Sequence, residues 1–404
     1  MAEGDENGPA ILALGVNRFF YSINWYAIAA TFFLIAPDLH AEVSGLGLVT
    51  SAFLISVGLF QLPAGILAAR LGSRNLCILG MAVASVSTLL SGAVAQLTAL
   101  VALRFVCGIG MAMFFSPSLT VWTRHMPRGK VGSGLGLYYA VTALGSAAGL
   151  FGLVLVGEAA GWRSSLALVG VLGLVSAALM AWKVPPDRPE KASSPSWPEL
   201  RAVLSDRWLL VVSLALLGTY ISSSLVGTFV VVYLHGSLGM PAASAGAIGG
   251  LFLLTGLVGA PLAGRLHDRY QNTKRLLIGI GGVVAVGMVL ASVPSTVAVL
   301  SAAIIVGLGN AAGITVSFAA VQVAGGLSQE HRVIASSWMN FIQLFAGFWA
   351  PSLFSYTTVV YGYPSAWLTS ALYPILLVVP ALAFRKKDTM RSSSTNPQAG
   401  SHRP

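Results

Sequence analysis

The first chemically distinctive feature is a charged side chain placed deep within a long apolar run. Arg104 lies inside the run 98–122. Burying a guanidinium in hydrocarbon costs at least ~2.5–3.5 kcal/mol on insertion scales, so a compensating partner or a function is expected. Arg104 therefore either bonds neighbouring helices, or it binds or senses an anion or couples to protonation.

Further polar side chains recur at helical spacing inside other apolar runs. Residues three or four apart share one helix face, as Tyr138 and Thr142 do. Such stripes are typical either of helix–helix hydrogen bonding with glycine packing or of a polar site lining. We interpret the set as a substrate-binding lining. Its predicted members are Tyr21, Asn24, Arg104, Tyr138, Thr142, Tyr220, Asn310, Trp338, Asn340 and Gln343.

Acidic side chains are absent from the interior of the apolar runs. All 13 Asp and Glu residues lie in loops, at termini or at run ends. A cationic substrate would therefore lack a counter-ion, and an embedded arginine favours an anionic or a neutral substrate. The sequence contains no GxxxxGK[ST] phosphate loop, metal-spaced His/Cys set or nucleophile–His–acid arrangement. We expect no enzymatic activity, no cofactor, no metal and no ATP-driven step.

The elements that must position these side chains are long apolar helices. Of 404 residues, 56% are apolar and 9% are charged, whereas a soluble domain carries about 25% charged residues. The net charge of +10 sits in short clusters between the runs, so we expect no nucleic-acid partner. Twelve runs of about 20 residues or more are long enough to cross a lipid bilayer. They are 12–36, 46–69, 75–96, 98–122, 131–157, 164–183, 208–234, 241–266, 275–293, 295–322, 333–359 and 365–384.

Lys and Arg are distributed unevenly over the two sides of the predicted spans. With the N-terminus inside, 21 of the 23 fall on the cytoplasmic side, Arg18 among them, and only Arg163 falls outside. This bias sets the orientation of membrane helices. The sequence therefore predicts a multi-pass protein of the cell membrane with both termini cytoplasmic.

The two halves of the chain carry matching motifs at one offset. Gly65 after the second span matches Gly264 after the eighth, and Gly108 in the fourth span matches Gly307 in the tenth; both pairs are 199 residues apart. Two motifs at one offset indicate duplication of a six-span unit. Many secondary transporters use such repeats to build two bundles around a midplane site.

Together these features resemble the major facilitator superfamily over residues 11–385. The family's loop motif G-x-x-x-D-R/K-x-G-R-R/K appears at 65–74 with Ala69 in place of the usual Asp, and the second copy retains Asp268. The family's span-four motif R-x-x-x-G-x-G begins at Arg104, and in the family this arginine hydrogen-bonds carbonyls of span one. The resemblance implies an all-α membrane fold of twelve helices in two pseudo-symmetric six-helix bundles. Its implied parts are bundles at 1–183 and 207–385, a cytoplasmic linker at 184–206 and a disordered cytoplasmic tail at 386–404.

The resemblance also implies a cytoplasmic gate. In the family, the motif's Asp interacts with the N-terminus of a helix in the opposite bundle and latches the cytoplasmic side shut. Because the first copy lacks its acid, we expect the gate to rest on Asp268, which should face Lys130 at the start of span five. The residues assigned to gating are Gly65, Arg70, Gly72, Arg74, Lys130, Gly264, Asp268 and Arg269.

We therefore predict a monomeric secondary transporter that moves a small organic or inorganic anion by alternating access. Efflux of a neutral or amphipathic compound is the alternative within the same class. A receptor or a channel is the alternative from another class. A receptor usually offers an extramembrane signalling domain, and a channel a filter motif or a charged ring; the sequence shows neither.

Overall fold

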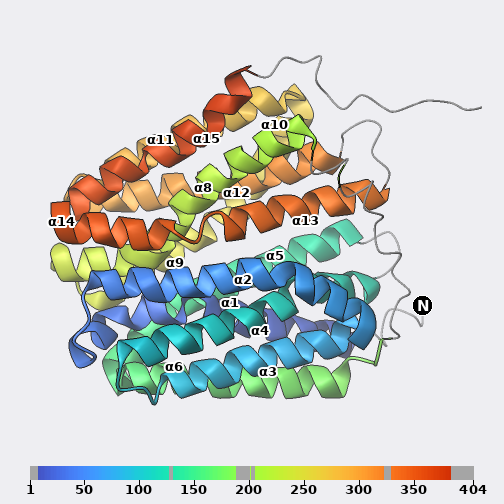
Figure 1. The fold of residues 1–404 in the computed structure, drawn as a ribbon, viewed down its shortest axis with the longest axis horizontal. Coiled ribbons are helices and arrows are strands. Elements are labelled where there is room, and N and C mark those ends of the chain that lie inside the picture. The colour runs from blue at the N-terminus through green and yellow to red at the C-terminus, as the bar shows by residue number, and fades with distance from the viewer. Residues whose placement is uncertain (1–7, 127–130, 188–200, 202–204, 323–328, 384–404) are drawn as a thin grey trace, which may run out of the picture.

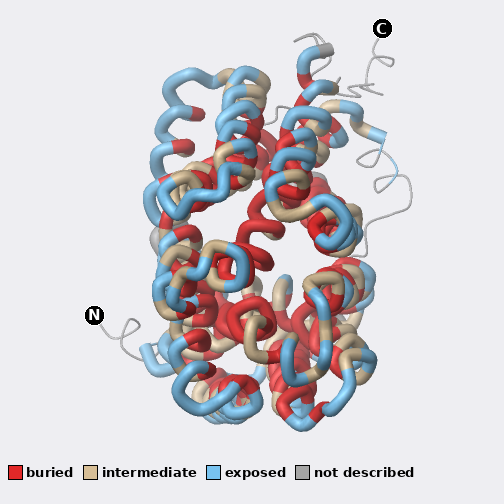
Figure 2. Tube along the Cα trace, turned by 90° about the vertical axis from the view of Figure 1, so that its left-hand side faces the viewer, coloured by how far each residue is buried: buried red, intermediate tan, exposed pale blue. Residues whose placement is uncertain are grey.

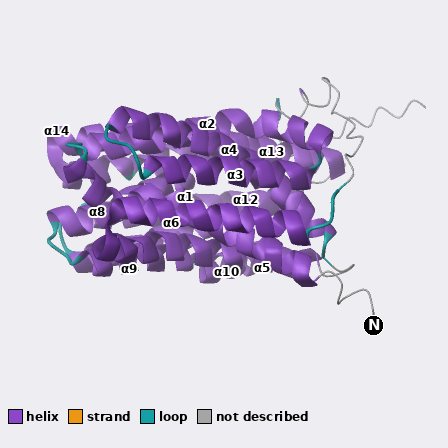
Figure 3. Ribbon diagram, turned by 90° about the horizontal axis from the view of Figure 1, so that it is seen from below, coloured by secondary structure: helices purple, strands orange, loops and turns teal. Residues whose placement is uncertain are grey.

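The described part of the chain is built from helices (Figure 3). The computed structural model describes residues 8–126, 131–187, 201, 205–322 and 329–383 (Figure 1). The helices are α1 (Gly8–Asp38), α2 (Val43–Leu71), α3 (Ser73–Ser91), α4 (Leu97–Arg124), α5 (Val131–Ala147), α6 (Leu153–Lys183), α8 (Arg207–Val232), α9 (Ala242–Leu254), α10 (Gly256–Tyr270), α11 (Thr273–Ala291), α12 (Thr296–Gln322), α13 (Gln329–Phe345), α14 (Ala350–Ser370) and α15 (Leu372–Ala383). Two π-helical turns, η1 (Ala148–Gly152) and η2 (Tyr233–Ser237), join α5 to α6 and extend α8.

The helices are long and apolar enough to cross a membrane. Ten stretches among the described residues meet that description, and two of them, Gly136–Lys183 and Trp338–Leu382, hold 48 and 45 residues. Each of these two is divided by a glycine with positive φ, Gly161 at 82° and Gly362 at 81°. Glycine adopts this conformation at little steric cost, so each stretch can fold back and supply two passes. Twelve passes require this pattern, and the all-α fold prediction is confirmed.

The predicted span limits differ from the observed helices at two outer turns, and one of them, 360–364 between the last two predicted spans, is helical apart from Gly362. The predicted loop 158–163 is helical apart from Gly161. Hydropathy marked it as a loop because Glu158 and Arg163 are charged, but a helix that ends near the membrane surface can carry charges on its last turns. Most of the predicted linker 184–206 and the whole predicted tail 386–404 lie outside the described residues.

The helices form two groups. Helices α1 to α6 pack against one another, and α8 to α15 pack against one another; the first group lies below the second in Figure 1. Buried residues gather where helices face each other, and much of the outer surface is exposed (Figure 2). That surface includes large apolar side chains such as Leu12, Val175 and Val297. An apolar exterior of this extent suits lipid contact.

The two bundles touch closely at one end. We name the end with the α1–α2 turn the outer end and the end with the α2–α3 turn the inner end, following the predicted orientation. At the outer end Ser352 Oγ donates to Ser51 Oγ at 2.9 Å across the α2–α14 seam. On the same seam, a Cβ added to Gly47 would lie 2.7 Å from the backbone oxygen of Pro351. The α9–η1 seam is equally tight, because a Cβ at Gly249 would lie 2.7 Å from a Leu150 methyl group.

The inner ends are less closely packed. A Cβ added to Gly65 of α2 would meet no atom within 4 Å, and one added to Gly264 of α10 would meet only Thr315 of its own bundle. Apolar side chains on α5 and α10 are half-exposed here, among them Leu137 at 50% and Leu262 at 52%. The described residues therefore show two bundles that pack tightly at the outer end and more loosely at the inner end.

Candidate functional site

The most unusual buried group is Arg18 on α1. Its side chain is 3% exposed, although it lies only about 15 Å from the start of α1 at the helical rise per residue. Arg18 Nε donates to Thr142 Oγ1 at 2.8 Å. Its guanidinium carbon lies 4.5 Å from the Tyr138 ring centroid and 4.6 Å from that of Tyr21. The assignment of Arg18 as a cytoplasmic orientation charge is therefore wrong, because the Thr142 hydroxyl and the Tyr138 ring of α5, with the Tyr21 ring of α1, hold the guanidinium inside the bundle.

Arg18 retains an unused donor. Its Nη1 is buried and has no hydrogen-bond partner in the described structure, and the same holds for the Tyr21 hydroxyl. The buried polar side chains among the described residues include no Asp or Glu. A buried cation without a carboxylate leaves a positive potential that an anion can neutralise.

Arg104 occupies a different position, inside the first bundle. Its Nη1 donates to Asn24 Oδ1 at 3.3 Å and lies 3.5 Å from Cys107 Sγ. Thr88 Oγ1 donates to the same Asn24 oxygen at 3.0 Å, so the group ties α1, α3 and α4 together. The Arg104 guanidinium carbon lies 4.3 Å from the centroid of the Phe53 ring, which itself packs edge-on against Trp25.

Several predicted lining residues surround Arg18. The hydroxyls of Tyr138 and Ser118 share a hydrogen bond of 2.8 Å, and Thr142 Oγ1 donates to the Tyr138 backbone oxygen. Tyr21 stacks on Phe114 with ring centroids 4.7 Å apart. The i, i+4 stripe seen in the sequence of α5 and the i, i+3 pair of Arg18 and Tyr21 on α1 thus meet at one place. The spacing of Arg18 to Tyr21 was the sequence signal that could have revealed Arg18.

The second bundle faces this group with uncharged side chains. Tyr220 of α8 packs against the apolar cluster that contains Tyr21 and Phe53. Gln343 Nε2 donates to Asn340 Oδ1 at 3.4 Å. The Tyr220 hydroxyl, Gln343 Oε1 and Asn310 Oδ1 are buried without a partner in the described structure.

Two of the predicted lining residues in the second bundle make no hydrogen bond or ring contact with Arg18 in the described part of the chain. Trp338 stacks on Phe341 with centroids 5.5 Å apart. Among the described hydrogen bonds, none joins Asn310 to Asn340 or Gln343. The structure thus brings Tyr21, Tyr138 and Thr142 directly to Arg18 and places Tyr220 in the cluster that contains Tyr21.

The first loop motif forms a compact network at the inner end. Gly72 has a φ of 85°, and a Cβ there would lie 2.7 Å from Asp187 Oδ1. The Arg74 backbone N–H donates to Asp187 Oδ2 at 3.0 Å, and Arg74 Nε donates to the Val184 backbone oxygen at 2.7 Å. Arg124 forms an ion pair with Asp187 at 3.3 Å. The network ties the α2–α3 turn to the ends of α4 and α6.

Sequence reasoning missed Asp187 because it lies in the segment assigned to the linker. Its position directly after the end of α6 was the available signal. Gly65 and Arg70, from the same motif, are exposed. In the second copy, Asp268 and Arg269 are exposed. His267, the residue before Asp268 on α10, is buried with Nε2 3.1 Å from Thr273 Oγ1. The predicted partner Lys130 lies outside the described residues.

Comparison with known proteins agrees with the fold. The chain is 28% identical over 300 residues to the probable sulfoacetate transporter of Cupriavidus necator, covering 69% of each chain. It is 26% identical over 291 residues to the nitrite extrusion protein of Bacillus subtilis, covering 71% of this chain and 73% of that one. A solved bacterial homologue of the human lysosomal transporter Spinster superposes with a TM-score of 0.81 at 15% identity, covering 96% of this chain and 99% of that one.

The family model described as Major Facilitator Superfamily matches residues 14–351. Its match spans both bundles and includes Arg18, Arg104 and the first loop motif. The resemblance noted from the loop motif and the internal repeat is confirmed. This chain belongs to the major facilitator superfamily of membrane transporters.

Proposed function

We propose that this protein is a secondary transporter that carries a small anion, and that Arg18 is its principal anion-binding residue. The observation that supports the proposal is the buried Arg18 guanidinium with a free Nη1 and no buried carboxylate among the described residues. A hydrogen bond to a charged group contributes about 1.5–3 kcal/mol. An anion reaching Nη1 from the bundle interface would gain this energy and neutralise the charge.

The surrounding residues supply the rest of the proposed site. The Tyr21 hydroxyl is free to bond a second oxygen of the anion, and across the interface Tyr220 and Gln343 offer further polar atoms without partners. Arg104 adds a second positive charge within the bundle and, through Asn24, holds α1 in position. We assign Arg104 this supporting role, in which it raises the positive potential without direct contact.

The proposal includes transport by alternating access. With the outer seams closed, the site communicates with the inner end; rocking of the two bundles would expose it to the outer end. The proposed gate retains Asp268 as the acid of the second loop motif, with Lys130 as its partner in the inner-closed state. We further propose that the protein is a monomer, that it lies in the cell membrane and that both of its termini are cytoplasmic.

A binding screen on the purified protein tests the substrate class. Nitrite, acetate and sulfoacetate are compared with choline as a cation and with glucose as a neutral solute; two of the relatives above are named for transport of nitrite or sulfoacetate. A ligand that binds the folded state raises its thermal stability by mass action. At least one anion should raise the thermal stability of the wild type but not that of Arg18→Gln. The control is Arg207→Gln, which changes an exposed arginine at the start of α8. It should respond like the wild type. Stabilisation by glucose or choline alone would overturn the anion proposal and favour efflux of another compound.

A further inference from the structure

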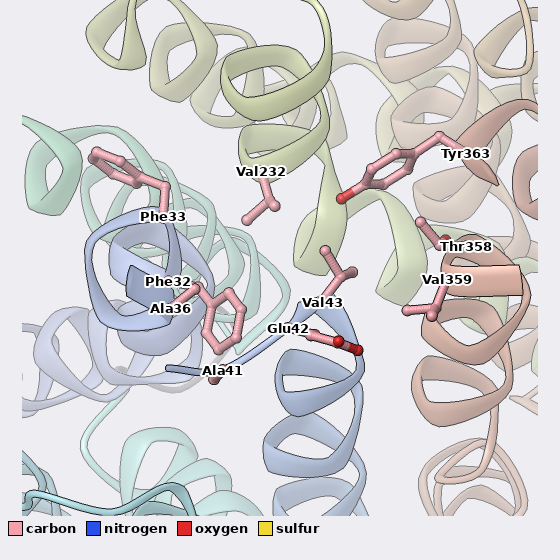
Figure 4. A pocket seen from close by; sticks show the side chains of 10 residues that line it. All are labelled: Phe32, Phe33, Ala36, Ala41, Glu42, Val43, Val232, Thr358, Val359 and Tyr363. Atoms are coloured by element: carbon pink, nitrogen blue, oxygen red, sulfur yellow. The ribbon is translucent and has the colours of Figure 1, made fainter. Parts of the chain in front are cut away.

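A pocket that is separate from the Arg18 site lies at the outer end between the two bundles. It has a volume of about 450 Å³, which is within the range of small-molecule sites. One wall comes from the end of α1 and the start of α2, including Phe32, Phe33 and Glu42 (Figure 4). The other comes from α8 and α14, including Val359 and Tyr363 (Figure 4). It lies far along α1 from Arg18 and shares no residue with the proposed anion site.

The pocket has few polar groups, and the Thr358 hydroxyl among them donates to the Phe354 backbone oxygen. Glu42 is the single charged side chain that lines it, and its carboxylate points into the space between the walls (Figure 4). Glu42 occupies the N-cap position of α2 but makes no side-chain capping hydrogen bond. The Tyr363 hydroxyl is buried without a partner in the described structure and faces the same space. Both groups can accept hydrogen bonds.

The neighbouring charges do not neutralise Glu42. Arg163, a basic residue at the outer end, forms an ion pair with Asp38. Asp38 also accepts a hydrogen bond from Trp162 Nε1 at 3.2 Å. His235, which packs edge-on against Phe33 at 4.9 Å, uses Nδ1 in a 2.8 Å contact with the Met240 backbone oxygen. Glu42 is exposed to solvent at the mouth of the pocket, so its carboxylate is available to an incoming ligand.

We propose that this outer pocket binds an amphipathic organic cation, namely a primary ammonium attached to an apolar or aromatic body. The ammonium donates to the Glu42 carboxylate and to the Tyr363 hydroxyl, and the body lies against Phe32, Phe33 and Val359. Aromatic faces attract cations, and the apolar walls gain from burial of the body. An anion is disfavoured because it would meet a carboxylate without a compensating cation among the lining residues.

The position of the pocket gives the ligand a conformational preference. The two walls belong to different bundles, so the complete pocket exists only when the outer end is closed. A ligand that contacts both walls binds this state more tightly and shifts the population toward it. The cation therefore slows transport by stabilising the outer-closed state, and it does so from a site other than the anion site.

Three matched compounds test the charge requirement on the purified protein in non-ionic detergent. Phenylbutylamine, phenylbutanol and phenylbutyrate share one body and differ in charge. The readout is protection of Val359→Cys from a maleimide; Val359 is 52% exposed, and the natural Cys77 and Cys107 are buried. The amine should protect at concentrations at least about ten-fold below the alcohol, as expected for a charge-assisted hydrogen bond of ~1.5 kcal/mol. Phenylbutyrate should not protect at these concentrations.

Two test variants and one control variant make the result specific. Glu42→Gln should reduce the amine to the potency of the alcohol, while Glu158→Gln, at an exposed acid on α6, should leave the difference intact. Val359→Trp, which fills the pocket, should abolish thermal stabilisation by the amine without abolishing anion uptake. Equal protection by the amine and the alcohol in the wild type would mean that the pocket binds the apolar body without recognising the ammonium, and it would overturn the proposal. Protection by phenylbutyrate at the lowest concentration would place the pocket on an anion exit path and overturn the proposal. Neither result bears on Arg18, so this inference and the anion proposal fail independently.

Discussion

The close packing of Gly47 predicts that one added methyl group opens the outer end. A Cβ at this position would lie 2.7 Å from the Pro351 backbone oxygen and closer still to Ser355 Oγ, and these atoms belong to the opposite bundle. Real Cβ atoms do not approach backbone oxygens to this distance, so α2 and α14 must separate. Overpacking of this kind costs ~1–3 kcal/mol. If that cost falls only on the outer-closed state, the ratio of outer-closed to outer-open protein falls about 5–150-fold.

Cysteine accessibility measures the shift in proteoliposomes. Ser51→Cys, on the closed seam, reports opening of the outer end, and Leu137→Cys, half-exposed on α5, reports closure of the inner end. Gly47→Ala should raise the labelling rate of Ser51→Cys and lower that of Leu137→Cys. Adding Ser355→Ala removes one of the clashing atoms and should restore part of the wild-type pattern.

Gly279→Ala is the matched control, because a Cβ there meets no atom within 4 Å. It should leave both labelling rates unchanged. If Gly47→Ala is folded and labels like Gly279→Ala, the outer seam does not determine the conformational balance, and the reasoning from the closed outer end is refuted.

Three further predictions follow from the topology and the polar networks. A cysteine at Ser44 should react with an impermeant maleimide on intact cells and one at Ser73 should not; the reverse pattern would contradict the orientation. Asp187→Asn should lower the apparent melting temperature, because it removes the Arg124–Asp187 ion pair, whereas Glu158→Gln should not. Equal melting temperatures would mean that this ion pair contributes no stability. Arg104→Lys should keep partial uptake, since lysine keeps the charge but loses the planar donor fork. Arg104→Gln should lose most of the uptake because α1 is displaced. Wild-type uptake by the Gln variant would limit Arg104 to a packing role.

Hydropathy and spacing were sufficient for the fold and for half of the candidate site. The apolar runs predicted the spans, and the four-residue spacing of Tyr138 and Thr142 placed both on the face that meets Arg18. Both signals are local, because a helix determines which residues share a face. Gly161 and Gly362 show the limit of this reasoning, since hydropathy predicts a loop where a single positive φ is enough to turn the chain.

The parts that sequence reasoning missed depend on contacts between distant segments. Arg18 was assigned to the cytoplasmic side by its position near a helix start, but its burial is decided by Thr142 and Tyr138, more than a hundred residues away. Asp187 likewise gains its role from Arg74 and Arg124. The outer pocket combines segments from four helices, so no spacing rule could reveal it.

The central claim is that Arg18 binds the transported anion, and uptake of labelled nitrite and sulfoacetate into proteoliposomes tests it most directly. For at least one of the two anions, Arg18→Gln should lower uptake about 10–150-fold, the equivalent of a charged hydrogen bond of ~1.5–3 kcal/mol. Arg18→Lys should retain an intermediate rate because it keeps the charge, and Arg207→Gln should transport like the wild type. Wild-type anion uptake by a folded Arg18→Gln variant would contradict the account.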